Sequence, residues 1–286
     1  MKVLITGANG QLGRAFQELF KNEKVEFIAA PKEELDITDL RKIREFVSKN
    51  PEITHIINCA AYNKVDEAER DWKTAYLVNG LGPRNLAIVA NEIDAELVHY
   101  STDYVFSGEK GSPYTIYDTP DPINRYGESK VLGERFLMSI ASKFYLIRTS
   151  WVFGDGMNFV KKVIEWSKKS QVLKIVDDEV SSPTYAPDLA RATWELIKQK
   201  AYGLYHITNS GYCSRYEWAE FILSKIGWSG ELKRAKQEDF NLPAKRPRFS
   251  VLDNFGWEET AGIAMREWKQ VVSEYIQYFP IKKVWR

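Results

Sequence analysis

The chain opens with an apolar segment, residues 2–6, that runs directly into three equally spaced glycines, Gly7, Gly10 and Gly13. An amphipathic segment follows at residues 11–20, with its apolar side chains at helical spacing. A strand, Gly-x-x-Gly-x-x-Gly and a helix in this order favour a dinucleotide-binding loop over a turn without a ligand. The first glycine permits a tight turn, the second lets the backbone approach a pyrophosphate, and the third lets the helix lie close to the sheet. A Walker-type loop is excluded because no Gly-Lys-Ser/Thr follows.

Strand-like and helical segments alternate through the first half of the chain. Apolar runs of strand type lie at residues 25–30, 55–61, 96–102 and 144–150. Segments with helical periodicity lie between them, at residues 39–50, 81–93 and 126–140. Strict alternation predicts a parallel sheet with helices on both faces. The predicted fold class is therefore α/β, a Rossmann-type doubly wound parallel sheet with a smaller α+β substrate-binding lobe.

The alternation weakens after about residue 150. Residues 1–150 are predicted to form the dinucleotide-binding domain, and residues 184–202 to return to it. Residues 151–183 and 203–286 are predicted to form the substrate-binding lobe. We expect the remaining helices at residues 158–170, 187–200, 214–227 and 265–279, and strands at residues 173–178 and 203–209.

Composition excludes several classes of partner. Forty basic and thirty-nine acidic residues give a net charge of +1, so the chain has no general attraction to nucleic acids or anionic membranes. It contains no apolar stretch of about 18 residues, and we expect no membrane-spanning segment. No signal-peptide pattern follows Met1, and we expect a cytoplasmic protein. Cys59 and Cys213 lack neighbours with metal-ligand spacing, and we expect free thiols.

Tyr126 and Lys130 are the first candidates for catalysis. They lie four residues apart in a predicted helix, so the phenol and the ammonium share one face. A phenol has a pKa of about 10, and a nearby ammonium is expected to lower it. Thr102 ends the strand predicted before this helix, and ligands bind beyond the carboxyl ends of strands in such sheets. We therefore predict that Thr102, Tyr126 and Lys130 form a catalytic set.

Seven segments resemble the extended short-chain dehydrogenase/reductase family and, within it, the dTDP-4-dehydrorhamnose reductases. The similarity extends over essentially the whole chain, and the fourth and seventh segments are the most specific. The segments are GANGQLGR, INCAAY, VDEAE, STDYVFSG, YGESKVLGE, IRTSWVFG and KRPRFSVLD. The resemblance implies reduction of the C4 keto group of dTDP-4-dehydro-L-rhamnose to dTDP-L-rhamnose, with NADPH or NADH as the reductant.

The resemblance also implies roles for individual residues. Tyr126 would protonate the sugar C4 oxygen, Lys130 would hold the nicotinamide ribose and tune Tyr126, and Thr102 would hydrogen-bond the same oxygen. The substrate-binding residues would be Asp103, Tyr104, Trp151, Arg246 and Arg248. The cofactor-binding residues would be Gly7, Gly10, Gln11, Leu12, Gly13, Asp36, Ile37, Ala60, Ala61, Tyr62, Asn63, Tyr126 and Lys130. Asn63 departs from the family pattern, which has Thr there in many members.

The type of nicotinamide cofactor depends on the end of the second predicted strand. This strand ends without the carboxylate that hydrogen-bonds a ribose 2′-hydroxyl, and Lys32 and Arg14 could meet a 2′-phosphate instead. These residues favour NADPH, with NADH as the alternative. Asp36 could contact the adenine or cap a helix. Arg246 and Arg248 could face a diphosphate or form a solvated basic loop.

Two other functions fit the same sequence. One is a non-catalytic regulatory subunit like the β subunit of methionine adenosyltransferase, which belongs to the same sequence group. The other is a different sugar-nucleotide reductase or an epimerase. A dehydratase is disfavoured, because Asp103 is followed by Tyr104 and not by a second carboxylate. The acidic runs show no metal-site geometry, so no metal is predicted, and the expected partner is a small dTDP-sugar, with a homodimer as an open possibility.

Overall fold

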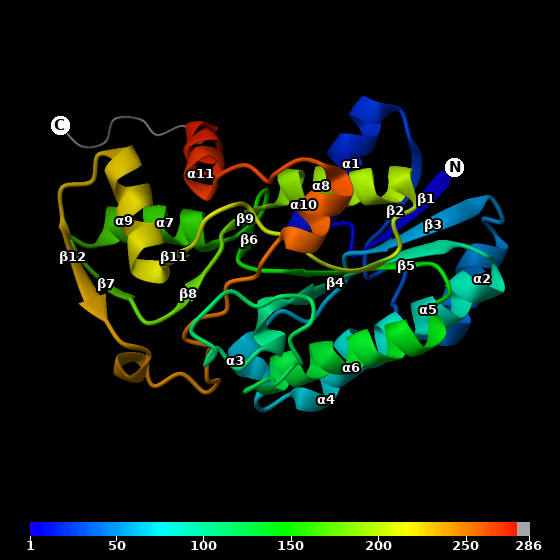
Figure 1. Ribbon diagram of the computed structural model, residues 1–286, viewed down its shortest axis with the longest axis horizontal. Coiled ribbons are helices and arrows are strands. Elements are labelled where there is room, and N and C mark those ends of the chain that lie inside the picture. Colours follow the sequence, from blue (N-terminus) through cyan, green and yellow to red (C-terminus); the bar gives the residue numbers. More distant parts are fainter. Residues whose placement is uncertain (279–286) are drawn as a thin grey trace.

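A six-stranded parallel sheet forms the centre of the computed structural model, which describes residues 1–278 (Figure 1). Its strand order is β10-β5-β4-β3-β1-β2, and every neighbouring pair is parallel. None of the helices in the described part of the chain is long and apolar enough to cross a membrane. The strands are β1 (Lys2–Thr6), β2 (Glu26–Ala30), β3 (Ile53–Asn58), β4 (Glu96–Thr102), β5 (Phe144–Thr149) and β10 (Gly203–His206).

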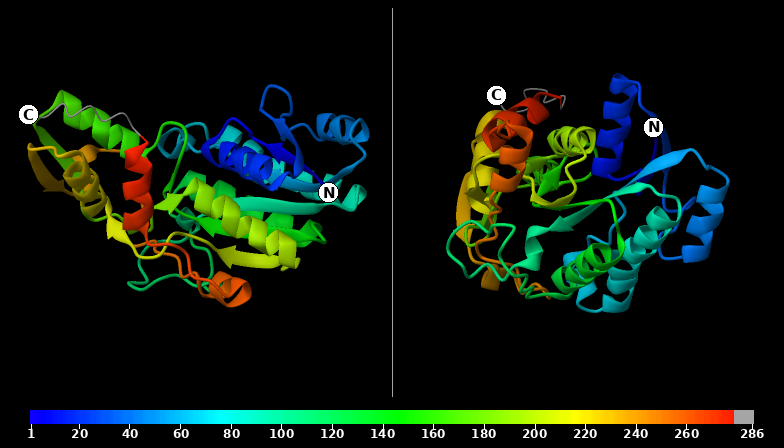
Figure 2. Two further views of the ribbon diagram at one scale, coloured as in Figure 1. Left: turned by 90° about the horizontal axis from the view of Figure 1, so that it is seen from above. Right: turned by 45° about the vertical axis from the view of Figure 1, so that its right-hand side comes forward.

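Helices cover both faces of this sheet, as the views in Figure 2 show. Alternate residues of a strand point to opposite faces. Val3 and Ile5 therefore pack against the helices of one face, and Leu4 packs against those of the other. The first face carries α1 (Gln11–Glu23) and α8 (Ala186–Gln199), and the second carries α2 (Leu40–Ser48), α5 (Gly82–Glu92) and α6 (Arg125–Ile140). The Rossmann-type doubly wound sheet is confirmed.

The order of the strands creates a crevice beside β1. The chain runs from β1 outward to β2 on one side, and then continues on the other side with β3 and β4. Ligands of such sheets bind where the strand order reverses, beyond the carboxyl ends of the strands. The β1–α1 loop and the residues that follow β3 therefore face each other across this crevice.

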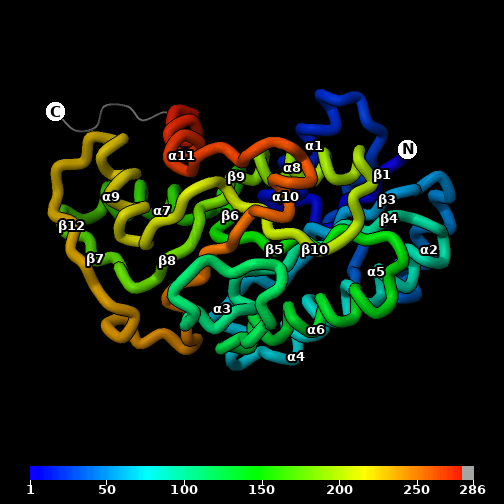
Figure 3. Tube along the Cα trace, in the orientation of Figure 1, coloured from blue at the N-terminus to red at the C-terminus, as the bar shows by residue number. Residues whose placement is uncertain are grey.

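A smaller lobe lies beside the carboxyl edge of the sheet. It contains a parallel pair of strands, β7 (Val172–Val176) and β12 (Glu231–Ala235), and its core surrounds the buried Trp218. Figure 3 shows the chain passing between the two parts more than once. The other elements of the lobe and its borders are β6 (Val152–Phe153), α7 (Phe159–Lys169), β8 (Val180–Ser181), β9 (Thr184–Tyr185), β11 (Cys213–Ser214), α9 (Arg215–Ile226), η3 (Gln237–Phe240) and α11 (Trp268–Gln277).

The structure corrects the predicted extent of the lobe. β10 joins the large sheet beside β5, and α10 (Phe255–Ala261) packs on α8 through the buried Trp257. Both elements lie in the range 203–286, which the sequence assigned to the lobe. The reason is that α8 returns the chain to the open edge of β5, where the next strand finds unpaired backbone groups. The predicted helix 265–279 is α11, and its last predicted residue, Phe279, lies outside the described residues.

Three short helices between residues 65 and 81 had no signal in the sequence. They are α3 (Val65–Ala68), α4 (Trp72–Tyr76) and the π-helical turn η1 (Leu77–Leu81). They depend on contact with α6, not on a periodicity of their own. A Cβ on Gly133 of α6 would lie only 2.1 Å from the carbonyl oxygen of Asn79, and the Asn79 side chain donates to Ser129.

Replacement of Gly133 by alanine tests this close packing. Because the new Cβ would overlap backbone that cannot move freely, Gly133→Ala should lower the free energy of unfolding by about 1–3 kcal/mol. Gly256→Ala, also in a helix, is the control, since its Cβ would have an ordinary contact of 3.5 Å with Ile116. Urea denaturation compares the two variants with the wild type. An equal stability of both variants would contradict the proposed role of this contact.

Candidate active site

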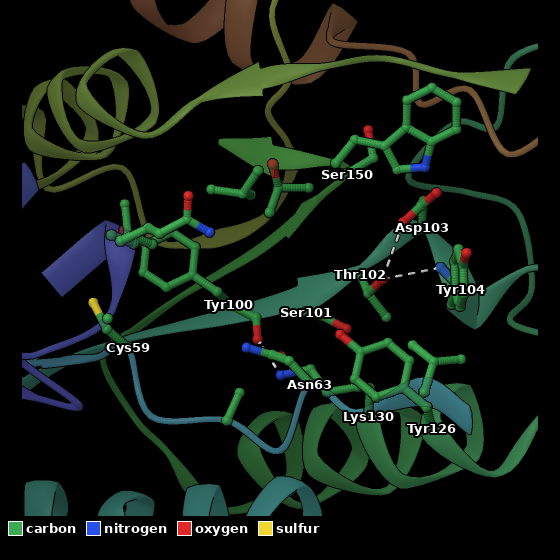
Figure 4. A pocket seen from close by; sticks show the side chains of 18 of the residues that line it. Cys59, Asn63, Tyr100, Ser101, Thr102, Asp103, Tyr104, Tyr126, Lys130 and Ser150 are labelled. Atoms are coloured by element: carbon green, nitrogen blue, oxygen red, sulfur yellow. Dashed lines mark hydrogen bonds between the residues drawn. The ribbon is translucent and has the colours of Figure 1, made fainter. Parts of the chain in front are cut away.

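A cleft of about 340 Å³ lies between the carboxyl edge of the sheet and the smaller lobe. Figure 4 shows the side chains that line it. It contains the predicted residues from the β1–α1 loop, from the segment after β3, from the end of β4, from α6 and from the lobe. They are Gly10, Gln11, Leu12, Ala60, Ala61, Asn63, Thr102, Asp103, Tyr104, Tyr126, Lys130 and Trp151.

The glycine loop has the geometry that its spacing predicts. Gly7 has a φ of +62°, and a Cβ there would lie 2.5 Å from the Ala60 nitrogen. A Cβ on Gly13 would lie 2.8 Å from Ala8, so this glycine allows the helix to approach the loop. A Cβ on Gly10 would meet only the Gly7 carbonyl oxygen, at 3.3 Å, and Gly10 itself lines the cleft.

The N-terminus of α1 faces the cleft without a protein side chain to cap it. Gly10 is the N-cap residue and provides no side-chain hydrogen bond, and the first turn contains no acidic residue. The first N–H groups of a helix lack partners within the helix, and they lie at the positive end of its dipole. These groups fit the pyrophosphate of a dinucleotide.

Two hydroxyl groups in the cleft also fit a polar ligand. The Ser101 and Thr149 hydroxyls are buried, line the cleft on neighbouring strands and have no hydrogen-bond partner among the described residues. A buried polar group without a partner costs about 1–3 kcal/mol. A dinucleotide bound here would offer them oxygen and nitrogen partners. The residues present therefore fit a nicotinamide dinucleotide.

The predicted catalytic set comes together in the cleft. A Cβ on Gly127 would lie 2.2 Å from the Tyr104 carbonyl oxygen, so this glycine lets α6 approach the end of β4. The ring of the adjacent Tyr126 lies edge-on to that of Tyr104, with centroids 5.9 Å apart. Thr102 and Tyr126 both line the cleft, and Lys130 donates to the Tyr100 carbonyl oxygen at 2.6 Å.

Burial changes the proton affinities of this set. It raises the pKa of Tyr126, an effect that Asp103 strengthens and the Thr102 hydroxyl opposes. It lowers the pKa of Lys130 to about 8, although Glu134 acts in the opposite direction. The predicted lowering of the Tyr126 pKa by Lys130 is thus wrong for this arrangement, because burial dominates and the ammonium points to a carbonyl. Tyr126 is protonated at neutral pH and can donate a proton.

Asp103 is only 2% exposed, and other side chains occupy both of its oxygens. Oδ1 accepts from the Thr102 hydroxyl at 3.0 Å, whereas Oδ2 accepts from Ser181 at 3.1 Å and from Ser250 at 2.6 Å. Burial raises the pKa of Asp103 to about 6, and the three hydroxyls and Arg215 limit the shift. The structure therefore places this carboxyl in a network behind Thr102 as well as at the cleft wall.

Aromatic side chains form the wall on the lobe side. Trp151 has a φ of +43°, an uncommon value for a side chain of this size. It stacks on Trp218, with centroids 5.6 Å apart and planes at 3°, and the Arg215 guanidinium lies 3.6 Å above its ring. Arg215 also lies 3.6 Å from Glu179. Sequence reasoning missed Arg215, because the packing of α9 alone brings it into the cleft.

The two predicted diphosphate-binding arginines do not line this cleft. Arg246 is paired with Asp66 at 2.6 Å and lies 3.8 Å from Glu179, so two carboxylates already match its charge. Arg248 is exposed, and its backbone carbonyl accepts from the Val180 amide at 2.8 Å. Arg246 connects α3 with the segment that leads to α10.

Five predicted cofactor residues also lie outside the lining of the cleft. They are Gly7 and Gly13, which shape the glycine loop, and Asp36, Ile37 and Tyr62. The Asp36 carboxylate accepts from the Thr38 amide and hydroxyl, at 2.9 and 2.8 Å, while Asp39 caps α2. The Asp36 cap alternative is therefore wrong. Ile37 is buried. The Tyr62 backbone is held by the Asn79 side chain.

The two basic residues that favoured NADPH lie in different settings. The Arg14 guanidinium makes an ion pair with Asp155 at 3.0 Å, which joins α1 to the segment before α7. Lys32 is exposed. The Arg14 guanidinium thus already has a carboxylate partner.

Metal-ligating side chains and thiols are the other groups in the chain that could carry chemistry. No group of three or more His, Cys, Asp or Glu side chains within residues 1–278 is placed to hold a metal ion. Cys59 and Cys213 are free thiols, and burial raises the pKa of each. Neither thiol is therefore a ready nucleophile.

With this geometry in place, comparison with known proteins identifies the family. Residues 1–280 match the model of the RmlD substrate binding domain. The chain belongs to this family. It is 40% identical to the spore coat polysaccharide biosynthesis protein SpsK of Bacillus subtilis over 278 residues, which cover 96% of this chain and 97% of that protein.

Solved structures of two reductases are similar over nearly the whole chain. A dTDP-4-dehydrorhamnose reductase from Clostridium acetobutylicum superimposes with a TM-score of 0.95 and 43% identity, covering 97% of this chain and 99% of the other. The Bacillus anthracis dTDP-4-dehydrorhamnose reductase in complex with NADP has a TM-score of 0.94 and 36% identity, with the same coverage.

Gly10→Ala tests the proposed phosphate-binding loop. Gly10 lines the cleft, and its Cβ would have one close protein contact, 3.3 Å from the Gly7 carbonyl oxygen, so the variant should lose little stability in a urea denaturation. Its dissociation constant for NADPH should rise about tenfold or more, measured by calorimetry. Gly256→Ala, far from the cleft on α10, should bind NADPH as the wild type does. Unchanged binding by Gly10→Ala would exclude the loop as the phosphate site.

Proposed function

We propose that this protein reduces the C4 keto group of dTDP-4-dehydro-L-rhamnose to dTDP-L-rhamnose, with NADPH as the preferred reductant and NADH as the alternative. The observation that carries the proposal is the convergence of Thr102, Tyr126 and Lys130 in one cleft beside the uncapped N-terminus of α1. The names of the relatives support the same reaction and substrate class.

When bound, the nicotinamide supplies a hydride to the sugar C4 carbon. Tyr126, held protonated by burial, donates its phenol proton to the C4 oxygen. The Thr102 hydroxyl donates a hydrogen bond to the same oxygen, where negative charge develops. We propose that Lys130, which donates to the Tyr100 carbonyl oxygen in the cleft, also holds the nicotinamide ribose.

The lobe provides the surface for the sugar nucleotide. We propose that Trp151 and Tyr104 flank the sugar. Contact of Arg246 and Arg248 with the diphosphate stays a prediction, since neither arginine lines the cleft. We further propose that the chain acts in the cytoplasm, with a homodimer as a possible assembly. The presence of Thr102, Tyr126 and Lys130 in one cleft supports an enzyme over a non-catalytic subunit. A reductase consumes reduced nicotinamide, whereas an epimerase has no net consumption of it.

Tyr126→Phe tests the reaction. Loss of the phenol proton should lower turnover of the dTDP-4-keto sugar by about 100-fold or more, because the developing alkoxide lacks its acid. NADPH binding should persist, since only one hydroxyl is removed. The rate is followed by loss of reduced nicotinamide absorbance, and the product by chromatography against dTDP-L-rhamnose. Tyr117→Phe, at an exposed tyrosine, should retain wild-type turnover.

The outcomes separate the candidate functions. NADPH binding without oxidation by the wild type would indicate a binding subunit. Conversion of a sugar nucleotide without net consumption of NADPH would indicate an epimerase. Retained turnover in Tyr126→Phe would remove Tyr126 from the mechanism.

A further inference from the structure

The Asp103 carboxyl is held asymmetrically. Its Oδ2 accepts from two serine hydroxyls, Ser181 on β8 and Ser250 on the segment before α10. Its Oδ1 faces the Thr102 hydroxyl. The two serines are themselves linked, because the Ser250 amide donates to the Val180 carbonyl and the Ser181 hydroxyl reaches the Ser250 carbonyl. Oδ2 is therefore held by the two serine hydroxyls, whereas Oδ1 contacts the cleft only through the Thr102 hydroxyl.

The hydroxyl of Thr102 has one proton and two lone pairs. One lone pair accepts from the Tyr104 amide at 3.1 Å. If Asp103 is ionised, the Thr102 proton points to Oδ1, and Thr102 presents a lone pair to the cleft. If Oδ1 is protonated, it donates to Thr102, both Thr102 lone pairs are occupied, and the Thr102 proton is free to point into the cleft.

We propose that Asp103 is a positioning residue whose protonation decides whether Thr102 donates or accepts a hydrogen bond in the active site. The inference rests on the proposed function. A ketone oxygen only accepts hydrogen bonds, whereas the alcohol product can also donate one. The protonated form of Asp103 therefore suits reduction of the ketone, and the ionised form suits binding and oxidation of the alcohol.

The groups around Asp103 place the protonation of its carboxyl within a pH range that can be tested. Arg215 on α9 is the cation that favours the ionised carboxyl, and burial opposes it more strongly. With the pKa of Asp103 raised to about 6, the carboxyl is protonated below that pH and ionised above it. The other titratable or charged groups around the network are Tyr126 on α6, Tyr104 on η2 (Asp103–Val105), and Glu179 and Arg246 from the lobe.

The first experiment measures single-turnover reduction of the dTDP-4-keto sugar by the NADPH-loaded enzyme from about pH 5 to about pH 8. For the wild type, the rate constant should be level at low pH and fall by about tenfold per pH unit above its midpoint. In Asp103→Asn the amide carbonyl can accept from both serines while the NH2 group donates to Thr102. This variant imitates the protonated carboxyl, so its rate constant should lose that pH dependence.

Two further variants are expected to move the midpoint of the pH dependence of the rate constant. Ser250→Ala and Ser181→Ala each remove a hydroxyl that favours the ionised carboxyl, so the midpoint should move to higher pH. Ser167→Ala is the matched control, because this buried hydroxyl donates to the Ile164 carbonyl within α7. Its midpoint should equal that of the wild type. Oxidation of dTDP-L-rhamnose by NADP+ should rise with pH across the wild-type midpoint.

Infrared difference spectra provide a readout that does not depend on turnover. The protonated Asp103 carboxyl should have a C=O band that titrates near the kinetic midpoint and is absent in Asp103→Asn. Thr102→Val should shift this band, because the carboxyl loses its partner. If Asp103→Asn is inactive at every pH, the serine variants and this band decide the question.

The proposal is overturned if Asp103→Asn keeps the wild-type pH dependence, if both serine variants leave the midpoint in place, or if the band does not respond to Thr102→Val. A wild-type protein that binds NADPH but does not reduce the sugar would instead overturn the proposed function. The infrared titration would then still show whether protonated Asp103 is hydrogen-bonded to the Thr102 hydroxyl.

Discussion

The close packing of α6 against the end of β4 and against η1 is the constraint on which the active site depends. Gly127 has no side chain where the Tyr104 carbonyl approaches, and Gly133 has none where Asn79 approaches. Any larger residue at either position would push the helix outward. The distance between Thr102, on the strand, and Tyr126, on the helix, is therefore set by backbone contact, which deforms much less than side-chain contact.

Burial then determines the proton states of the groups that this contact brings together. The pKa values of Tyr126 and Asp103 rise and that of Lys130 falls, so each group shifts toward its neutral form. Removing charge from water is costly, and the protein offsets this cost with hydroxyls at Asp103 and with a backbone carbonyl at Lys130. Because burial raises the pKa of Asp103 to about 6, its carboxyl can change protonation state within the pH range of the reaction.

The smaller lobe is a part of the active site and not only a cover for it. Trp151, held on Trp218 and beneath Arg215, forms one wall, and the serines of β8 and of the segment before α10 hold Asp103. Arg14 and Arg246 make ion pairs that join the sheet domain to lobe segments. The position of the lobe and the orientation of Thr102 are thus coupled through direct contacts.

Local order in the chain was sufficient to predict the sheet, the glycine loop and the meeting of Thr102, Tyr126 and Lys130 in one cleft. Strand and helix periodicities, glycine spacing and the four-residue interval between Tyr126 and Lys130 all express contacts between neighbours in sequence, so they can be interpreted without knowledge of the fold. The short helices before residue 82, the place of β10 at the sheet edge, Arg215 and the two serines behind Asp103 could not be predicted. They arise from contacts between segments far apart in the chain, and only the tertiary structure decides which distant segments meet and how deeply their polar groups are buried.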